Sequence, residues 1–109
     1  MRTITKAKEW DNIRRKLKVE FEEKEITRCE LGLPGCKRDN FLSFAHRHKR
    51  VWYDEHKGML GKFEQCLLLC TFPCHDTLEK DAKLTEETFL RLRGEEIFIA
   101  LLGIQLRRN

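Results

Sequence analysis

The chain has 109 residues, a net charge of +4 and a charged fraction of 37%, against about 25% in typical globular proteins. This length suits a single domain with one core, and the composition is that of a globular chain. The longest apolar stretch, Ile97–Leu106, is about half of the roughly 20 residues that span a bilayer, which excludes a transmembrane helix. The first residues lack the apolar run of a secretory signal, so we expect a cytoplasmic protein.

An amphipathic helix is predicted over residues 6–25, with Thr5 as its N-cap. Its apolar side chains recur at helical spacing and form one stripe: Trp10, Ile13, Leu17 and Phe21. The opposite face is charged. The stripe therefore predicts a helix that covers one side of the core.

The middle of the chain predicts short extended segments. Residues 41–46 are rich in aromatic side chains and are expected to form a strand. A second strand is expected around Val51–Tyr53, within an otherwise polar loop. The apolar run Cys66–Cys70 is expected to be buried, as either helix or strand.

The C-terminal third predicts helices. A short helix is expected to begin within residues 74–82, and Thr85 is expected to cap a further helix that ends before Gly94. An apolar helix is then predicted over residues 95–108. One possible use of that last helix is dimerisation, in a structural or regulatory protein.

Five cysteines in a chain without a signal sequence favour metal binding over disulfides, because reducing compartments keep thiols free. Four of them form the pairs Cys29-x6-Cys36 and Cys70-x3-Cys74, and glycine and proline in the first pair allow the chain to turn back. Structural zinc takes four tetrahedral ligands, so the sequence predicts a structural zinc site. The alternative is unpaired core cysteines. Cys66 lies in an apolar run and is assigned to the core.

Basic residues concentrate in the first half of the chain. Residues 1–50 hold 14 Lys and Arg against 8 Asp and Glu, whereas residues 51–109 hold 8 against 10. Basic runs attract phosphates through counterion release, which makes nucleic acid the expected partner. A solvated surface is the alternative. The densest runs are Arg14-Arg15-Lys16, Lys37-Arg38 and Arg47-His48-Lys49-Arg50.

The order of these features over residues 27–82 resembles the HNH endonuclease family, and in particular its small phage-type members with a four-cysteine zinc site. The resemblance rests on a cysteine pair, a strand that ends in His46, and an apolar run into a second cysteine pair followed by His75. It implies an α+β fold with a ββα-metal core, also called a His-Me finger. In a single domain over residues 1–109, the zinc-stapled core would be flanked by helices over 6–25 and 85–108. It also implies a phage or mobile-element protein of the bacterial cytoplasm.

The same resemblance assigns roles to individual residues. His46 matches the general base and His75 matches the ligand of a catalytic divalent ion, Mg²⁺ or Mn²⁺, in an enzyme that hydrolyses phosphodiester bonds. The four cysteines match the zinc knuckles that hold the fold. Trp52 and Tyr53 are candidates for base stacking or for the core. The expected phosphate contacts to DNA are Arg47, Lys49, Arg50, Lys37 and Arg38.

Two positions depart from the family pattern. Ala45 stands where members often carry Asp or His as a second metal ligand, and Gln65 stands where they often carry an Asn that orients the base. Three side chains could replace the missing ligand: His48, Asp76 and His56. Of these, His48 shares a face with His46 if the strand continues. The alternative function is a catalytically inactive, zinc-stapled module of phage origin that binds nucleic acid or protein.

Overall fold

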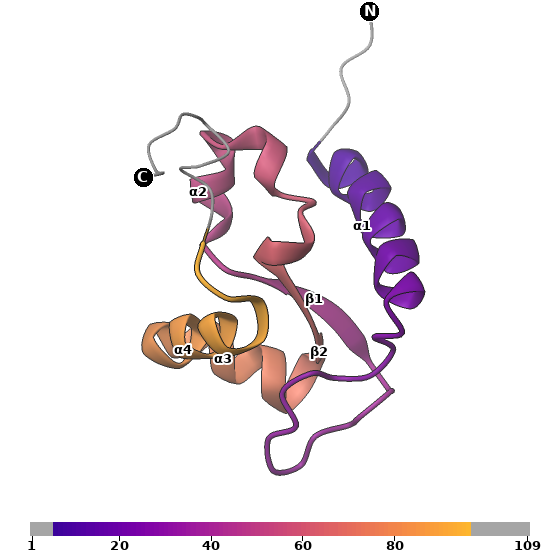
Figure 1. The fold of residues 1–109 in the computed structure, drawn as a ribbon, viewed down its shortest axis with the longest axis vertical. Coiled ribbons are helices and arrows are strands. Elements are labelled where there is room, and N and C mark those ends of the chain that lie inside the picture. Colours follow the sequence, from indigo (N-terminus) through magenta and orange to yellow (C-terminus); the bar gives the residue numbers. More distant parts are fainter. Residues whose placement is uncertain (1–5, 97–109) are drawn as a thin grey trace, which may run out of the picture.

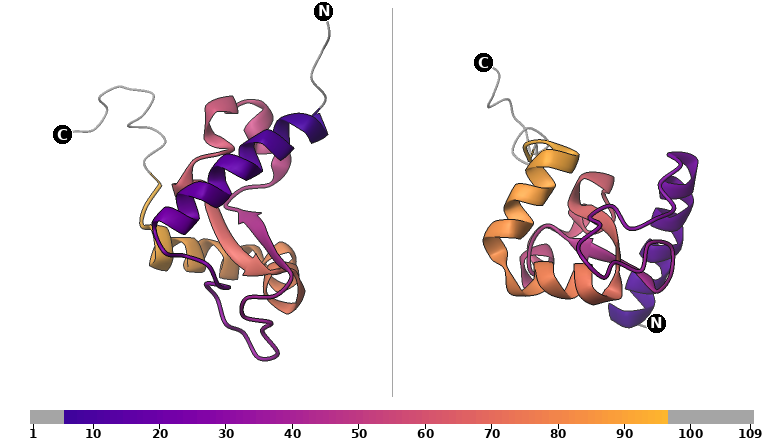
Figure 2. Two further views of the ribbon diagram at one scale, coloured as in Figure 1. Left: turned by 90° about the vertical axis from the view of Figure 1, so that its right-hand side faces the viewer. Right: turned by 90° about the horizontal axis from the view of Figure 1, so that it is seen from below.

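The computed structural model describes residues 6–96, which form three layers (Figures 1 and 2). A two-stranded sheet lies in the middle, with α1 on one side and α3 and α4 on the other. This architecture is compatible with the expected α+β class. The elements are α1 (Lys6–Glu23), β1 (Leu42–His46), α2 (Arg50–Asp54), β2 (Cys66–Cys70), α3 (Asp76–Lys80) and α4 (Ala82–Arg93).

The two strands are antiparallel, with a register that runs from Leu42 opposite Cys70 to His46 opposite Cys66. The predicted strand over residues 41–46 is therefore confirmed within one residue. Every residue of β2 is buried, because helices cover both faces of the sheet. A strand covered on both faces reads as a continuous apolar run, which is why residues 66–70 did not distinguish strand from helix.

Alternate side chains of the strands enter two cores. On the α1 side, Leu17 and Phe21 pack against Cys66 and Leu68 of β2. On the other side, Ala45 of β1 packs in a cluster with the remaining β2 leucines, Leu78 and Phe89. The predicted apolar stripe of the first helix thus faces the sheet, and Cys66 is fully buried as expected.

The expected strand at Val51–Tyr53 is wrong, because these residues lie inside the helix α2. In a strand, residues 51 and 53 would share one face. In α2 they separate: Val51 is 70% exposed, whereas Tyr53 is 4% exposed and its hydroxyl donates to the Gln65 side chain at 2.7 Å. The helix therefore buries Tyr53, whose hydroxyl has a polar partner, and exposes Val51.

The predicted cap at Thr85 is also wrong. α4 begins earlier, and the Asp81 carboxylate accepts the N–H of Leu84 at 2.9 Å as its N-cap. The Thr85 hydroxyl donates to the carbonyl of Asp81 at 2.9 Å, the bond to residue i−4 that threonines inside helices often form, and also to the carbonyl of Leu78 in α3 at 2.6 Å. The end before Gly94 is confirmed, and that glycine has a φ of 83°. Glu95 and Glu96 are not helical, and the rest of the helix predicted over 95–108, with its dimer contact, lies outside the described residues.

A buried ion pair joins segments that are far apart in the sequence. Arg93 of α4 donates to Glu30 at 2.7 Å, and their side chains are 4% and 11% exposed. Glu30 also accepts the N–H of Leu68, and Arg93 also donates to three main-chain carbonyls. The pair therefore ties the loop after α1 and strand β2 to the end of α4. Among the described residues, no helix combines the length and the apolar character needed to cross a membrane.

Candidate functional site

The four paired cysteines meet at one end of the sheet. Cys29 and Cys36 come from the loop after α1, Cys70 ends β2, and Cys74 lies in the turn that follows. All four sulfur atoms lie within 4.8 Å of one another, and none is in a disulfide. Within residues 6–96 this is the only cluster of three or more Cys, His, Asp or Glu side chains that could hold a metal ion. Four thiolates at this spacing suit an ion such as zinc.

The loop between the first two cysteines is shaped by its main chain. Gly32 and Gly35 have φ values of 72° and 84°, which side chains disfavour, so these turns need glycine. The N–H of Cys29 donates to the Arg38 carbonyl at 2.8 Å and closes the loop. The N–H groups of Leu33 and Arg38 point at the sulfurs of Cys74 and Cys36, at 3.4 and 3.3 Å. Such donors stabilise thiolates, the form that binds metal.

The thiols of this cluster differ in acidity. Burial opposes ionisation of Cys29, but the N–H groups of Gly32, Cys70 and Leu31 outweigh it and lower the pKa of Cys29 to about 7. Burial raises the pKa of Cys74 to about 12, and the neighbouring thiols add to the rise. The cluster therefore favours one thiolate on its own, and a bound cation is what allows the remaining thiols to ionise.

A second feature is an open cleft of about 1040 Å³ that follows β1. Every residue of β1 lines it, α1 forms one wall, and α3 and α4 form the other. His46, His48 and His75 all line this cleft. The structure thus brings together the two histidines that the sequence singled out, although they lie 29 positions apart in the chain.

His46 has a defined tautomer in this cleft. Its Nε2 lies 3.2 Å from the carbonyl oxygen of Leu60, and because that oxygen can only accept, Nε2 carries the proton and Nδ1 the lone pair. The ring packs edge-on against Trp10 and Tyr53, with centroids 5.1 and 5.3 Å away. Burial lowers the pKa of His46 to about 4. The imidazole is therefore neutral at pH 7.

His75 contacts two polar side chains that sequence reasoning missed. Its Nδ1 lies 2.7 Å from the Ser43 hydroxyl, and its Nε2 lies 3.6 Å from a carboxylate oxygen of Glu79. Both partners carry a signal in the sequence. Glu79 follows His75 by four residues, which places both on one helix face, and Ser43 shares a strand face with Ala45.

Ala45 lies on the face of β1 that packs against α3 and α4. Its side chain is 3% exposed and packs with Leu67 and Leu69, so this position contributes no polar group to the cleft. Of the three suggested replacements, only His48 lines the cleft. Asp76 pairs with Lys80 at 3.1 Å, and the His56 ring stacks on Trp52 instead.

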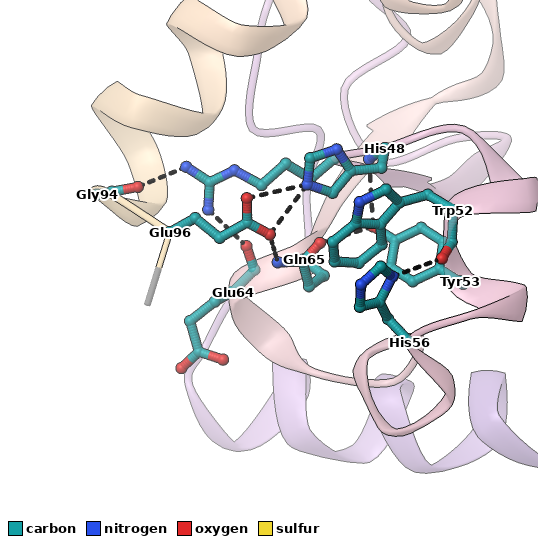
Figure 3. Close-up of polar contacts among 9 residues, drawn as sticks. His48, Trp52, Tyr53, His56, Glu64, Gln65, Gly94 and Glu96 are labelled. Atoms are coloured by element: carbon teal, nitrogen blue, oxygen red, sulfur yellow. Dashed lines mark hydrogen bonds and ion pairs between the residues drawn. The ribbon is translucent and has the colours of Figure 1, made fainter. Parts of the chain in front are cut away.

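His48 belongs to a network of polar side chains at the rim of the cleft (Figure 3). β1 ends at His46, and beyond it the Nε2 of His48 donates to Glu96 at 2.9 Å. Glu96 also accepts from the Gln65 amide at 2.6 Å, and Gln65 in turn accepts the Tyr53 hydroxyl. Gln65 is thus linked to the His46 ring only through Tyr53, rather than by a direct bond.

The aromatic residues proposed for base stacking are already engaged. The rings of His48 and His56 both stack on the Trp52 indole with centroids 4.0 Å away, as Figure 3 shows. Tyr53 is buried. Tyr53 is therefore a core residue, and the Trp52 indole is the central ring of a stack with His48 and His56.

The predicted phosphate contacts divide into three groups. Arg47 donates to the carbonyls of Gly94 and Glu64, at 2.6 and 3.3 Å, and so holds the end of α4. Lys49 and Arg50 are exposed at the cleft. Lys37 and Arg38 are exposed on the cysteine loop and do not line the cleft.

The two walls of the cleft differ in charge. The side formed by α1 and the segment after β1 carries its basic residues, whereas the side formed by α3, α4 and the segment after α4 carries its acidic residues. The acidic side chains are Glu79, Glu86, Glu95 and Glu96. A basic wall attracts phosphate and an acidic wall attracts a cation, so the cleft can accept both.

Comparison with known protein-family models finds no family that matches this chain, and neither the curated proteins nor the solved structures give a match. The function is therefore inferred from the cysteine cluster and the cleft themselves.

Proposed function

We propose that this protein is a metal-dependent HNH-type endonuclease that hydrolyses phosphodiester bonds in DNA. The observation that carries the proposal is the shared cleft of His46 and His75, in which His46 presents a neutral ring with its lone pair on Nδ1. The chain order also supports a ββα-metal core, since His46 ends β1 and His75 directly precedes α3.

His46 is the proposed general base. In the reaction its Nδ1 accepts a proton from the attacking water, while Nε2 stays bonded to the Leu60 carbonyl. The low pKa keeps the ring unprotonated at neutral pH. A phosphate bound beside the ring favours the protonated form and raises this pKa toward the range that general-base catalysis needs.

His75 and Glu79 are the proposed holders of the catalytic divalent ion. An imidazole nitrogen and a carboxylate oxygen, completed by water, are a donor set that suits Mn²⁺ or Mg²⁺. With Nε2 directed to the ion, Nδ1 of His75 donates to Ser43, which fixes the orientation of the ring. The ion, when bound, supplies positive charge that stabilises the phosphate and the leaving oxygen. In this proposal Glu79 provides the carboxylate that Ala45 lacks.

The four-cysteine cluster is the proposed structural zinc site. It joins the loop after α1 to the end of β2 and to the turn that carries His75. Zinc there would hold the main chain of that turn and so position His75 at the cleft.

The burial of Ala45 favours a second candidate. If no divalent ion binds near the buried, apolar Ala45, the chain is a zinc-stapled module that binds nucleic acid or protein without cleaving it. In this candidate function the cysteine cluster and the basic wall of the cleft serve binding, and no phosphodiester bond is hydrolysed.

Nicking of supercoiled plasmid in Mg²⁺ or Mn²⁺ tests the proposal. We expect wild type to nick and His46→Ala to lower the rate by about 10²–10⁴-fold, the usual contribution of a general base. His75→Ala should lower the rate and also weaken its dependence on the metal ion.

His56→Ala is the matched control, because this histidine lies outside the cleft. It should leave nicking close to the wild-type rate. No cleavage with any divalent ion would favour the binding module, and equal cleavage by all three variants would contradict the assigned site.

A further inference from the structure

Two large apolar side chains lie close in the sequence to the clustered cysteines and are among the most exposed apolar side chains of the described residues. Phe41 is 74% exposed and Phe72 is 63% exposed. The N–H and the hydroxyl of Thr71 both donate to the Phe41 carbonyl, at 2.7 and 2.8 Å, which places residue 41 beside residues 71 and 72. Neither ring packs on another ring in the described part of the chain. Most of the surface of both side chains is therefore accessible to a ligand.

The main chain at Phe41 is strained. Its φ is 55°, a left-handed conformation that bulky side chains rarely adopt. A buried phenylalanine ring would stabilise the fold and so offset this strain, but the ring of Phe41 is exposed. An unfavourable conformation that presents an exposed aromatic ring points to a role in binding.

This aromatic pair adjoins β1, the strand that lines the candidate catalytic cleft. Phe41 directly precedes Leu42 and Ser43, which line the cleft. Thr71 lies 3.4 Å from the Ser43 hydroxyl, and Ser43 contacts His75. The two phenylalanines are thus joined to the His75 side of the cleft by a short chain of contacts.

Exposed basic residues lie close to Phe41 in the sequence. Lys37 and Arg38 are within four residues of Phe41 along the chain, and in the described structure their side chains form no ion pair or hydrogen bond. Flat apolar rings on a surface that also carries free cations match the chemistry of a base and its phosphate. A fully paired duplex keeps its bases stacked on one another, so only unpaired bases can use such rings.

We propose that Phe41 and Phe72 form a stacking platform for unpaired nucleotides, with Lys37 and Arg38 as the phosphate contacts. The substrate of the cleft would then be DNA with a single-stranded segment beside the bond that is cut. The link to cleavage rests on the proposed function, whereas binding at the platform does not require cleavage.

Fluorescence anisotropy without added divalent ion tests the platform, using a labelled single-stranded oligonucleotide and the matching blunt duplex. We expect Phe41→Ala and Phe72→Ala each to weaken single-strand binding by about tenfold and to leave duplex binding nearly unchanged. Phe41→Leu keeps apolar area but loses the aromatic face, so it should behave like alanine. Val19→Ala, which removes an exposed apolar group on α1, is the matched control and should bind like wild type.

Phe41→Asn separates binding from stability. Asparagine tolerates a positive φ, so this variant should unfold about 2–5 °C higher than wild type while its single-strand binding falls. Equal losses on single strand and duplex, unchanged binding in both phenylalanine variants, or a lower Tm for Phe41→Asn would overturn the proposal. If wild type binds single strands through these rings but nicks nothing, the platform stands and the nuclease does not.

Discussion

The four-cysteine cluster and the cleft along β1 differ in how complete a set of metal ligands each one offers. The cluster brings four cysteine sulfurs within 4.8 Å of one another, with main-chain donors already directed at two of them. The cleft is open, and its histidines contact different partners, the Leu60 carbonyl for His46 and the Ser43 hydroxyl for His75. Closed sites are typical of structural metals, whereas a site with open positions is what substrate and water require. The comparison therefore supports the proposal that the cluster contributes stability and that the cleft contributes the chemistry.

The largest expected effect comes from breaking the cluster. Cys74→Ala removes a buried ligand, and the zinc should be lost with it. Because a structural zinc ion contributes energy comparable to the whole stability of a small domain, about 5–15 kcal/mol, we expect the variant to unfold. Metal analysis and circular dichroism on heating provide the measurements.

Cys66→Ala is the matched control for this experiment. Cys66 is equally buried but lies outside the cluster, in the core against α1. It should keep one zinc ion per chain and lose only about 1–2 kcal/mol of unfolding free energy, from the small cavity. Equal loss of metal in both variants would contradict the assignment of the ligands.

The next effect tests whether the cleft lacks a ligand at Ala45. Ala45→Asp places a carboxylate at a 3% exposed position and should lower the free energy of unfolding by about 3–5 kcal/mol without metal. If the position borders the ion site, Mn²⁺ at a hundred times its Kd should restore about 2.7 kcal/mol. Urea unfolding with and without Mn²⁺ measures both values. Ala45→Asn offers no charge, so a Mn²⁺ response as large in that variant would show that the ion binds elsewhere.

The pH dependence of stability tests the environment of His46. Burial lowers the pKa of His46 to about 4 from its usual 6.5, so the native state binds fewer protons than the unfolded state between these values. Stability therefore rises with pH through this window, and acidification from pH 6.5 to 4 should cost on the order of 3 kcal/mol from this residue.

Urea unfolding of wild type and His46→Gln at a series of pH values isolates this contribution. Protonation of the cysteine ligands affects both proteins, so only the difference between their profiles reports on His46. The two curves should diverge as the pH falls below 6.5. Parallel profiles would mean that the ring is not buried in its neutral form.

The smallest effect concerns the orientation of His75. Ser43→Ala removes the hydroxyl next to Nδ1 and should lower unfolding stability by about 1 kcal/mol. If Ser43 holds the ring for metal binding, Mn²⁺ affinity should also fall by about 10-fold or more. Isothermal titration with Mn²⁺ measures this, and Ser43→Thr, which keeps a hydroxyl, should retain most of the affinity. Unchanged Mn²⁺ affinity in the alanine variant would remove Ser43 from the site.

Some features could be predicted from the sequence because they depend on local pattern. The apolar stripe from Trp10 to Phe21 indicates α1, since residues three or four apart share a helix face. The aromatic strand that ends at His46, the end of α4 before Gly94 and the pairing of four cysteines are likewise visible in short stretches.

Other features were decided only by the tertiary structure, because they depend on which distant segments pack together. The run Cys66–Cys70 became a strand because β1 pairs with it and helices cover both of its faces. Packing also placed Ala45 in the core, gave His75 its contact with Ser43 and joined Glu30 to Arg93. The sequence by itself determined which residues are candidates for metal and proton chemistry, and the fold decided which neighbours surround them, since a side chain's partners follow from packing across the whole chain.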